Sequence, residues 1–174
     1  METQGQGAAD AAQLAAVQTR LVLNGRMRSR LGWFYWIAAL SLINSGAYLF
    51  GAKFTFVIGL GITQVMDAVV TALIQQLGDE SGLLRIIGLV IDICVAGAFA
   101  LIGYFGRKRI RWPVIVGMVV YALDAILMLI VPDILGAAFH AWALFAIWTG
   151  LRAMRQLNAL EKPAVTPVIG SLPS

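Results

Sequence analysis

Charged residues are scarce in this sequence of 174 residues, where they make up 13% of the chain against 60% hydrophobic residues. Soluble domains contain about 25% charged residues, so the composition excludes a mainly soluble protein and predicts an integral membrane protein. The first 30 residues also lack the basic start, the apolar core and the cleavage site of a signal peptide. We therefore expect the first span to stay in place as an uncleaved anchor.

Sequence motifs typical of disulfides, metal sites and enzymes are missing as well. Cys94 is the single cysteine, so an intramolecular disulfide is excluded, and no Cys/His pattern resembles a zinc site. There is no G-x-S-x-G nucleophile motif, and the residues after Gly61 do not continue a dinucleotide fingerprint. The net charge of +4 fits arginines placed beside membrane spans, so we expect no nucleic-acid partner. These absences argue against an enzyme, and no cofactor is predicted.

Four hydrophobic runs are long enough to cross a bilayer, which takes about 20 apolar residues. They cover about 31–50, 83–105, 112–131 and 136–152. The predicted fold is an all-α four-helix transmembrane bundle within residues 31–160.

The two ends of the chain are expected to lie in the cytoplasm. Residues 1–30 predict an amphipathic helix on the membrane surface, with its arginines near anionic head groups. Residues 161–174 contain three prolines and predict a flexible tail.

The stretch 54–76 is also long enough to span, but the positive charges argue against a crossing. With four spans, eleven Lys and Arg residues lie on the cytoplasmic side and only Lys53 and Arg85 lie outside. The positive-inside rule strongly prefers that arrangement. Gln64, Asp67, Thr71 and Gln75 recur at helical spacing and form one polar stripe. We therefore expect 54–76 to be a re-entrant, amphipathic segment in the outer leaflet.

Asp92 and Asp124 lie near the middle of two predicted spans. A carboxylate there costs about 2.5–3.5 kcal/mol on insertion scales, so it usually faces a protein interior or a water-filled cavity. Counted from the outer helix ends, Asp92 lies about 13 Å deep and Asp124 about 12 Å deep. We expect them to share one outward-opening cavity for a ligand or ion. Its predicted lining residues are Asn44, Ser45, Asp67, Arg85, Asp92, Tyr121, Asp124 and His140.

These polar residues have more than one interpretation. They can be hydrogen bonds that hold the helices together. Asp92, Asp124 and His140 can ligate a divalent metal, although no local ligand spacing supports this. Two nearby carboxylates can also carry protons. The cytoplasmic turn 106–112 is a separate candidate, for contact with lipid or a partner, through Arg107, Lys108, Arg109 and Arg111.

The function expected is that of a small polytopic inner-membrane protein, acting as a binding or accessory subunit. Its cavity would hold a small ligand or a lipid head group, and its partners would be the bilayer and a membrane protein or a second copy. A proton- or cation-coupled carrier using Asp92 and Asp124 is the alternative. A metal-dependent intramembrane enzyme using both aspartates and His140 has the least support.

Overall fold

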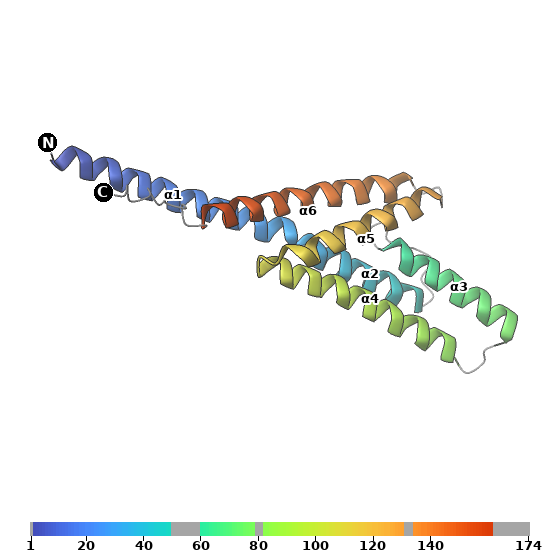
Figure 1. The fold of residues 1–174 in the computed structure, drawn as a ribbon. Helices are drawn as coiled ribbons and strands as arrows, with labels where there is room; N and C mark the ends of the chain where they lie inside the picture. Colours follow the sequence, from blue (N-terminus) through green and yellow to red (C-terminus); the bar gives the residue numbers. More distant parts are fainter. Residues whose placement is uncertain (1, 50–59, 79–81, 131–133, 162–174) are drawn as a thin grey trace, which may run out of the picture.

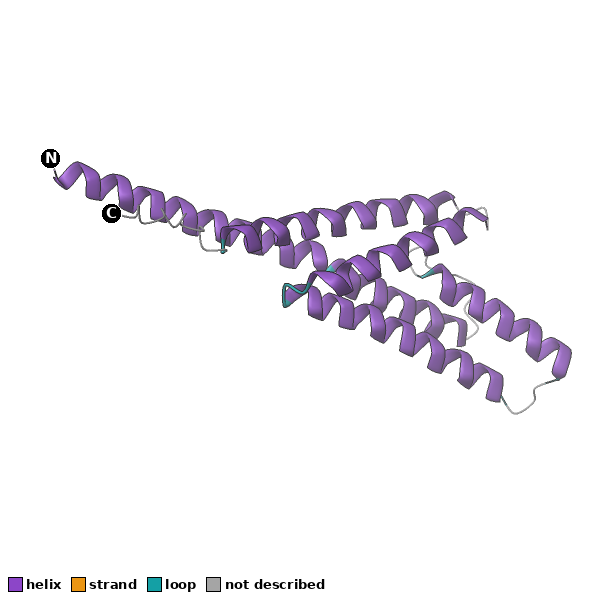
Figure 2. Ribbon diagram, in the orientation of Figure 1, coloured by secondary structure: helices purple, strands orange, loops and turns teal. Residues whose placement is uncertain are grey.

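The computed structural model describes residues 2–49, 60–78, 82–130 and 134–161, and these residues form six helices and no strand (Figures 1 and 2). The prediction of an all-helical protein is confirmed. The helices are α1 (Glu2–Leu31), α2 (Trp33–Leu49), α3 (Gly61–Leu77), α4 (Leu83–Arg107), α5 (Arg111–Ile130) and α6 (Ile134–Leu160).

Three of these helices are long and apolar enough to cross a membrane, namely α4, α5 and α6. They coincide with the second, third and fourth predicted spans, although α6 continues eight residues beyond position 152. The first predicted span corresponds to α2, whose 17 described residues extend about 25 Å. Residue 131 and the tail from 162 lie outside the described residues.

Helices α4, α5 and α6 alternate in direction, and α2 packs antiparallel to α4 (Figure 1). Near one end of the bundle, a Cβ at Gly103 of α4 would meet Phe34 and Tyr35 at the start of α2. Further along, Ser45 of α2 reaches Asp92 of α4. The tight turn between α4 and α5 places Arg109 in the left-handed region, with a φ of 62°.

Helix α3 runs in the same direction as α2, because both are antiparallel to α4. Val70 of α3 packs on Gly88, nearer the start of α4, while Leu60 lies beside Val95 and Phe99, nearer its end. The backbone N–H of Leu60 donates to Ser41 in the middle of α2. By residue 60 the chain has therefore returned about 12 Å from the last described residue of α2. Positions 54–59 of the predicted re-entrant segment lie outside the described residues.

The amino-terminal helix α1 is more than a surface helix. Its last turns pack against the second half of α6, where Met27 and Leu31 are buried with Leu151, Met154 and Leu157. Its earlier part projects from the bundle (Figure 1). There the large apolar residues Leu14, Val17 and Leu21 are exposed.

Much of the molecule's outer surface is apolar, as expected of a chain surrounded by lipid. Large side chains such as Val90, Val119, Leu123 and Phe145 are exposed on α4, α5 and α6. The polar side chains Ser41, Asn44, Ser45, Thr63, Asp92, Asp124 and His140 are buried instead. Apolar side chains thus cover the outside of the bundle, and polar side chains lie in its interior.

Candidate functional site

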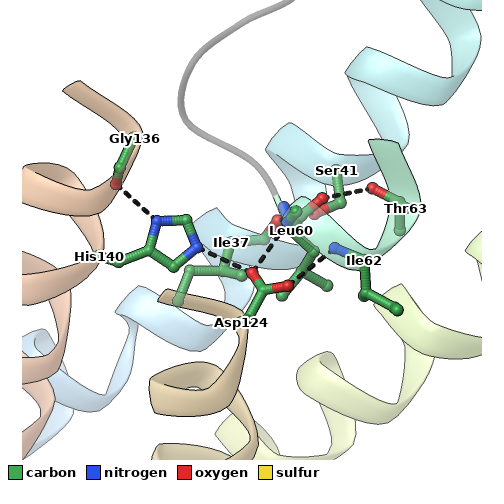
Figure 3. A network of polar contacts seen from close by, with 9 residues as sticks. Ile37, Ser41, Leu60, Ile62, Thr63, Asp124, Gly136 and His140 are labelled. Carbon is green, nitrogen blue, oxygen red and sulfur yellow. Dashed lines mark hydrogen bonds and ion pairs between the residues drawn. The ribbon is translucent and has the colours of Figure 1, made fainter. Parts of the chain in front are cut away.

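The carboxylate of Asp124 on α5 caps the amino-terminal end of α3. Oδ2 accepts the backbone N–H of Gly61 at 2.8 Å, and Oδ1 accepts that of Ile62 at 2.8 Å (Figure 3). The first N–H groups of a helix have no partner within it, and Leu60 at the N-cap supplies no side-chain cap. Asp124 therefore satisfies α3 from another helix, and a helix amino terminus favours a negative charge at this place.

His140 on α6 completes this arrangement. Its Nδ1 lies 2.7 Å from the carbonyl oxygen of Gly136, and its Nε2 lies 2.8 Å from Oδ2 of Asp124 (Figure 3). A carbonyl oxygen can only accept, so Nδ1 carries a hydrogen. One further proton lies between Nε2 and Oδ2, because two bare acceptors would repel. The imidazole and the carboxyl group together therefore hold that proton at no net charge.

Tyr121 covers this pair from one side. Its ring stacks on the imidazole of His140 with the ring centroids 4.4 Å apart and the planes at 20°. Tyr121 is one turn before Asp124 on α5, and both side chains are buried. We call Tyr121, Asp124, His140 and the amides of Gly61 and Ile62 the Asp124 cluster.

A second cluster lies where α2, α3 and α4 meet. The hydroxyl of Ser45 donates to Oδ2 of Asp92 at 2.7 Å. Oδ1 of Asp92 is fully buried and has no hydrogen-bond partner. Among the described side chains, it is the single buried nitrogen or oxygen atom without one. Asp67 and Arg85 line the same small cavity. We call Ser45, Asp67, Arg85 and Asp92 the Asp92 cluster.

Asp67 and Asp92 line the same cavity, so the charge of one carboxyl group acts on the other. Burial, and after it the charge of Asp92, raises the pKa of Asp67 to about 7. Two carboxyl groups in one cavity and the raised pKa of Asp67 together support one proton held by this pair near neutral pH.

The cavity in the Asp92 cluster is small. Its lining residues, which include Val70, Gly88 and Leu89, leave no space for a molecule as large as water. A lipid head group does not fit there unless α3 moves. A proton, or a small cation stripped of its water, is the ligand that matches the space and the charge.

Helix α2 connects the two clusters through a pair of serines one turn apart. Ser41 accepts the backbone N–H of Leu60 at 3.0 Å and donates to the carbonyl of Ile37 at 2.8 Å. Ser45 donates to Asp92. The hydroxyl of Thr63 returns to the carbonyl of Leu60 at 2.7 Å, which tightens the start of α3 (Figure 3).

The structure thus divides the residues predicted to line one cavity into two groups. Asp92 and Asp124 share no hydrogen-bond partner among the described residues, because Asp92 binds Ser45 of α2 whereas Asp124 binds the start of α3. Asn44 is buried next to Ser45 in the chain. Among the described residues, no group of three His, Cys, Asp or Glu side chains is placed to hold a metal. The trio of Asp92, Asp124 and His140 is therefore not assembled as a metal site.

The cations of the turn after α4 contact the protein itself. Arg107 lies over the ring of Tyr35 at 4.7 Å, and Lys108 lies over the ring of Tyr104 at 5.4 Å. Arg109 forms an ion pair with Glu161 just after α6. Arg111 begins α5 and is exposed. Three of the four residues predicted to contact lipid or a partner thus help to fix the turn in place.

Sequence reasoning missed the capping of α3 by Asp124. The donors are backbone N–H groups, which every residue except proline possesses, so no residue type marks them. The available signal was the Gly59-Leu60-Gly61 break directly before an amphipathic helix, together with a carboxylate left without a partner in a predicted span.

Comparison of the chain with known protein families, with curated proteins and with solved structures finds no match.

Proposed function

We propose that this chain is a non-enzymatic membrane subunit that binds a small cation at the Asp92 cluster. In the arrangement described above, that cation is a proton. The observation that carries the proposal is the buried Oδ1 of Asp92, which has no partner and belongs to a cavity beside a second carboxyl group. An unpaired buried carboxylate oxygen is costly, so it is the place where a positive ligand gains most.

In the proposed topology, four helices span the inner membrane, namely α2, α4, α5 and α6. Both termini lie in the cytoplasm. The parallel course of α2 and α3 supports it, because α3 then returns toward the side that α2 has reached. The excess of Lys and Arg on the opposite side supports it as well. In this arrangement Arg85 and the Asp92 cluster lie toward the outer face.

We further propose that the subunit acts through a protein partner or a second copy. A bundle of this size is small for an alternating-access carrier, which is usually built from repeated halves. Its wide apolar surface leaves room for a neighbour within the bilayer. A partner can sense whether the Asp92 cluster is protonated, because Asp67 of α3 and Asp92 of α4 face one cavity between the two helices.

Counting protons tests the binding site. Purified protein in neutral detergent is taken from pH 6 to pH 8 with a dye that reports released protons. Wild-type protein should release more protons than the Asp92→Asn variant. In the wild type, Asp67 loses its proton as the pH rises through its pKa of about 7. In the variant the charge of Asp92 no longer raises the pKa of Asp67, so more of Asp67 has already lost its proton at pH 6.

Asp10→Asn is the matched control, because Asp10 is exposed on the projecting part of α1. It should release the same number of protons as wild type. Equal release by wild type and Asp92→Asn would refute the proposed site.

A proton- or cation-coupled carrier is the second candidate, and the Asp67–Asp92 pair favours it over a carrier built on Asp92 and Asp124. Proteoliposomes distinguish the two functions. Proton flux that is lost in Asp92→Asn and kept in Asp10→Asn would establish the carrier, whereas proton binding without flux supports the subunit.

A further inference from the structure

An apolar groove of about 520 Å³ lies between α5 and α6, away from both polar clusters. All of its lining side chains are apolar except Arg155 at one end. Among them are Met118, Ala122, Leu144, Phe145 and Trp148. Phe145 and Trp148 are exposed, so the groove opens on the surface that lipid would cover.

The groove has the dimensions of one bilayer leaflet. Arg155 is 21 residues after the start of α6, about 31 Å along the helix, which matches the hydrocarbon thickness of about 30 Å. Leu144 is eleven residues before Arg155, or about 16 Å. The apolar part of the groove therefore covers the half of the bilayer next to the arginine, and Arg155 lies at head-group level.

A second guanidinium lies beside the first. Arg152 is one turn before Arg155 on α6 and stands over the ring of Trp148 at 4.7 Å. The ion pair found at this end of the described chain joins Arg109 to Glu161, and no described carboxylate pairs with Arg152 or Arg155. Guanidinium groups bind phosphate oxygens well, and basic pockets between spans bind anionic lipid head groups.

We propose that this groove is a binding site for an anionic phospholipid, with an acyl chain between α5 and α6 and the phosphate at Arg152 and Arg155. A second copy of the chain is a poorer occupant. A parallel neighbour would bring the same two arginines to the same depth, and like charges would oppose the contact. The site is independent of the cation site at Asp92.

Native mass spectrometry tests the head-group contact. Protein is released from nanodiscs that contain equal amounts of phosphatidylglycerol and phosphatidylcholine with identical acyl chains. Wild-type protein should retain the anionic lipid preferentially, and Arg155→Gln should lower that preference about fivefold, the equivalent of about 1 kcal/mol per arginine near the surface. Arg20→Gln, which changes another exposed arginine, on the projecting part of α1, should keep the preference.

A second variant tests the acyl-chain contact. Ala122→Phe fills part of the groove without changing a charge, so it should lower the retained amount of both lipids. The helical circular dichroism of each variant shows that the bundle is intact. The proposal is overturned if Arg155→Gln and Arg20→Gln retain the same lipids, or if Ala122→Phe retains as much lipid as wild type.

Discussion

At the scale of single residues, Asp92 and Asp124 are both buried carboxylates, and their surroundings give them different roles. Asp124 accepts two backbone N–H groups and contacts His140, so its two oxygens are occupied. Asp92 has a single serine hydroxyl and an oxygen without a partner. A satisfied carboxylate holds structure together, whereas an unsatisfied one is suited to take up and release a ligand.

Removing the charge of Asp124 should loosen the start of α3. In Asp124→Asn the amide NH₂ group faces one of the two backbone N–H donors, so that hydrogen bond is lost and the donors oppose each other. Hydrogen bonds to charged groups contribute about 1.5–3 kcal/mol. We expect hydrogen exchange at Gly61 and Ile62 to become about 10- to 100-fold faster.

Asp10→Asn again serves as the control for this measurement, since it removes one exposed carboxylate far from α3. It should leave exchange across α3 unchanged. If α3 in Asp124→Asn keeps wild-type protection, the cap does not hold the helix.

At the scale of helices, small residues decide how closely the elements approach. A Cβ at Gly117 on α5 would lie 2.8 Å from Cε1 of Phe34 and 2.9 Å from Cγ2 of Ile102. These atoms belong to α2 and α4, so three helices meet at this glycine. Small residues at such positions let helix backbones pack closely within a bilayer.

Gly117→Ala should therefore destabilise the bundle by about 1–3 kcal/mol, the usual cost of forcing extra atoms into a packed core. Gly97→Ala is the matched control, because a Cβ at Gly97 on α4 meets nothing within 4 Å. It should be neutral or slightly stabilising, since alanine favours the helix. Unfolding in detergent compares the two, and equal midpoints would show that Gly117 is not a close contact.

Much of the helix pattern could be predicted from the sequence, because hydrophobic length and charge are local properties. The runs that gave α4, α5 and α6 were placed within a few residues, apart from the carboxyl-terminal extension of α6. The pairing of polar residues could not be predicted in the same way. Depth along a helix places Asp92 and Asp124 at similar levels, but it does not tell which neighbour each helix face meets.

The orientation of α3 shows the same limit. Its polar stripe was found from helical spacing, yet Asp67 of that stripe lines a cavity inside the bundle with Asp92, while the apolar Val69 and Leu73 are exposed. In water an amphipathic helix buries its apolar face. In a bilayer the preference is reversed, since ionisable groups avoid lipid.

At the scale of the whole molecule, the arginines of α1, of the turn after α4 and of the second half of α6 lie toward one end of the bundle. Arg107 over Tyr35 joins that turn to α2, and Arg30 packs on Gly150 of α6. The end of α3 and the start of α4 lie toward the opposite end (Figure 1). This charge asymmetry is the basis of the proposed orientation.

Cysteine labelling in intact cells should report this orientation. In a Cys94→Ala background, Gln76→Cys near the end of α3 should react with a maleimide that cannot cross membranes. Lys108→Cys, in the turn after α4, should react only after the cells are permeabilised. Both positions are exposed in the structure, so access depends on the side of the membrane. Labelling of Lys108→Cys from outside would reverse or refute the topology.

The contact between Gly61 and Asp124 also has a consequence for the order of biosynthesis. The residue that secures the start of α3 is made 63 positions after it, and His140 follows 16 positions later still. At about 5–20 residues per second, α3 waits at least 3–12 seconds for its anchor. Helix α4 is made within that interval, but Asp124 is not. The start of α3 can therefore be capped only after α4 and part of α5 have been made.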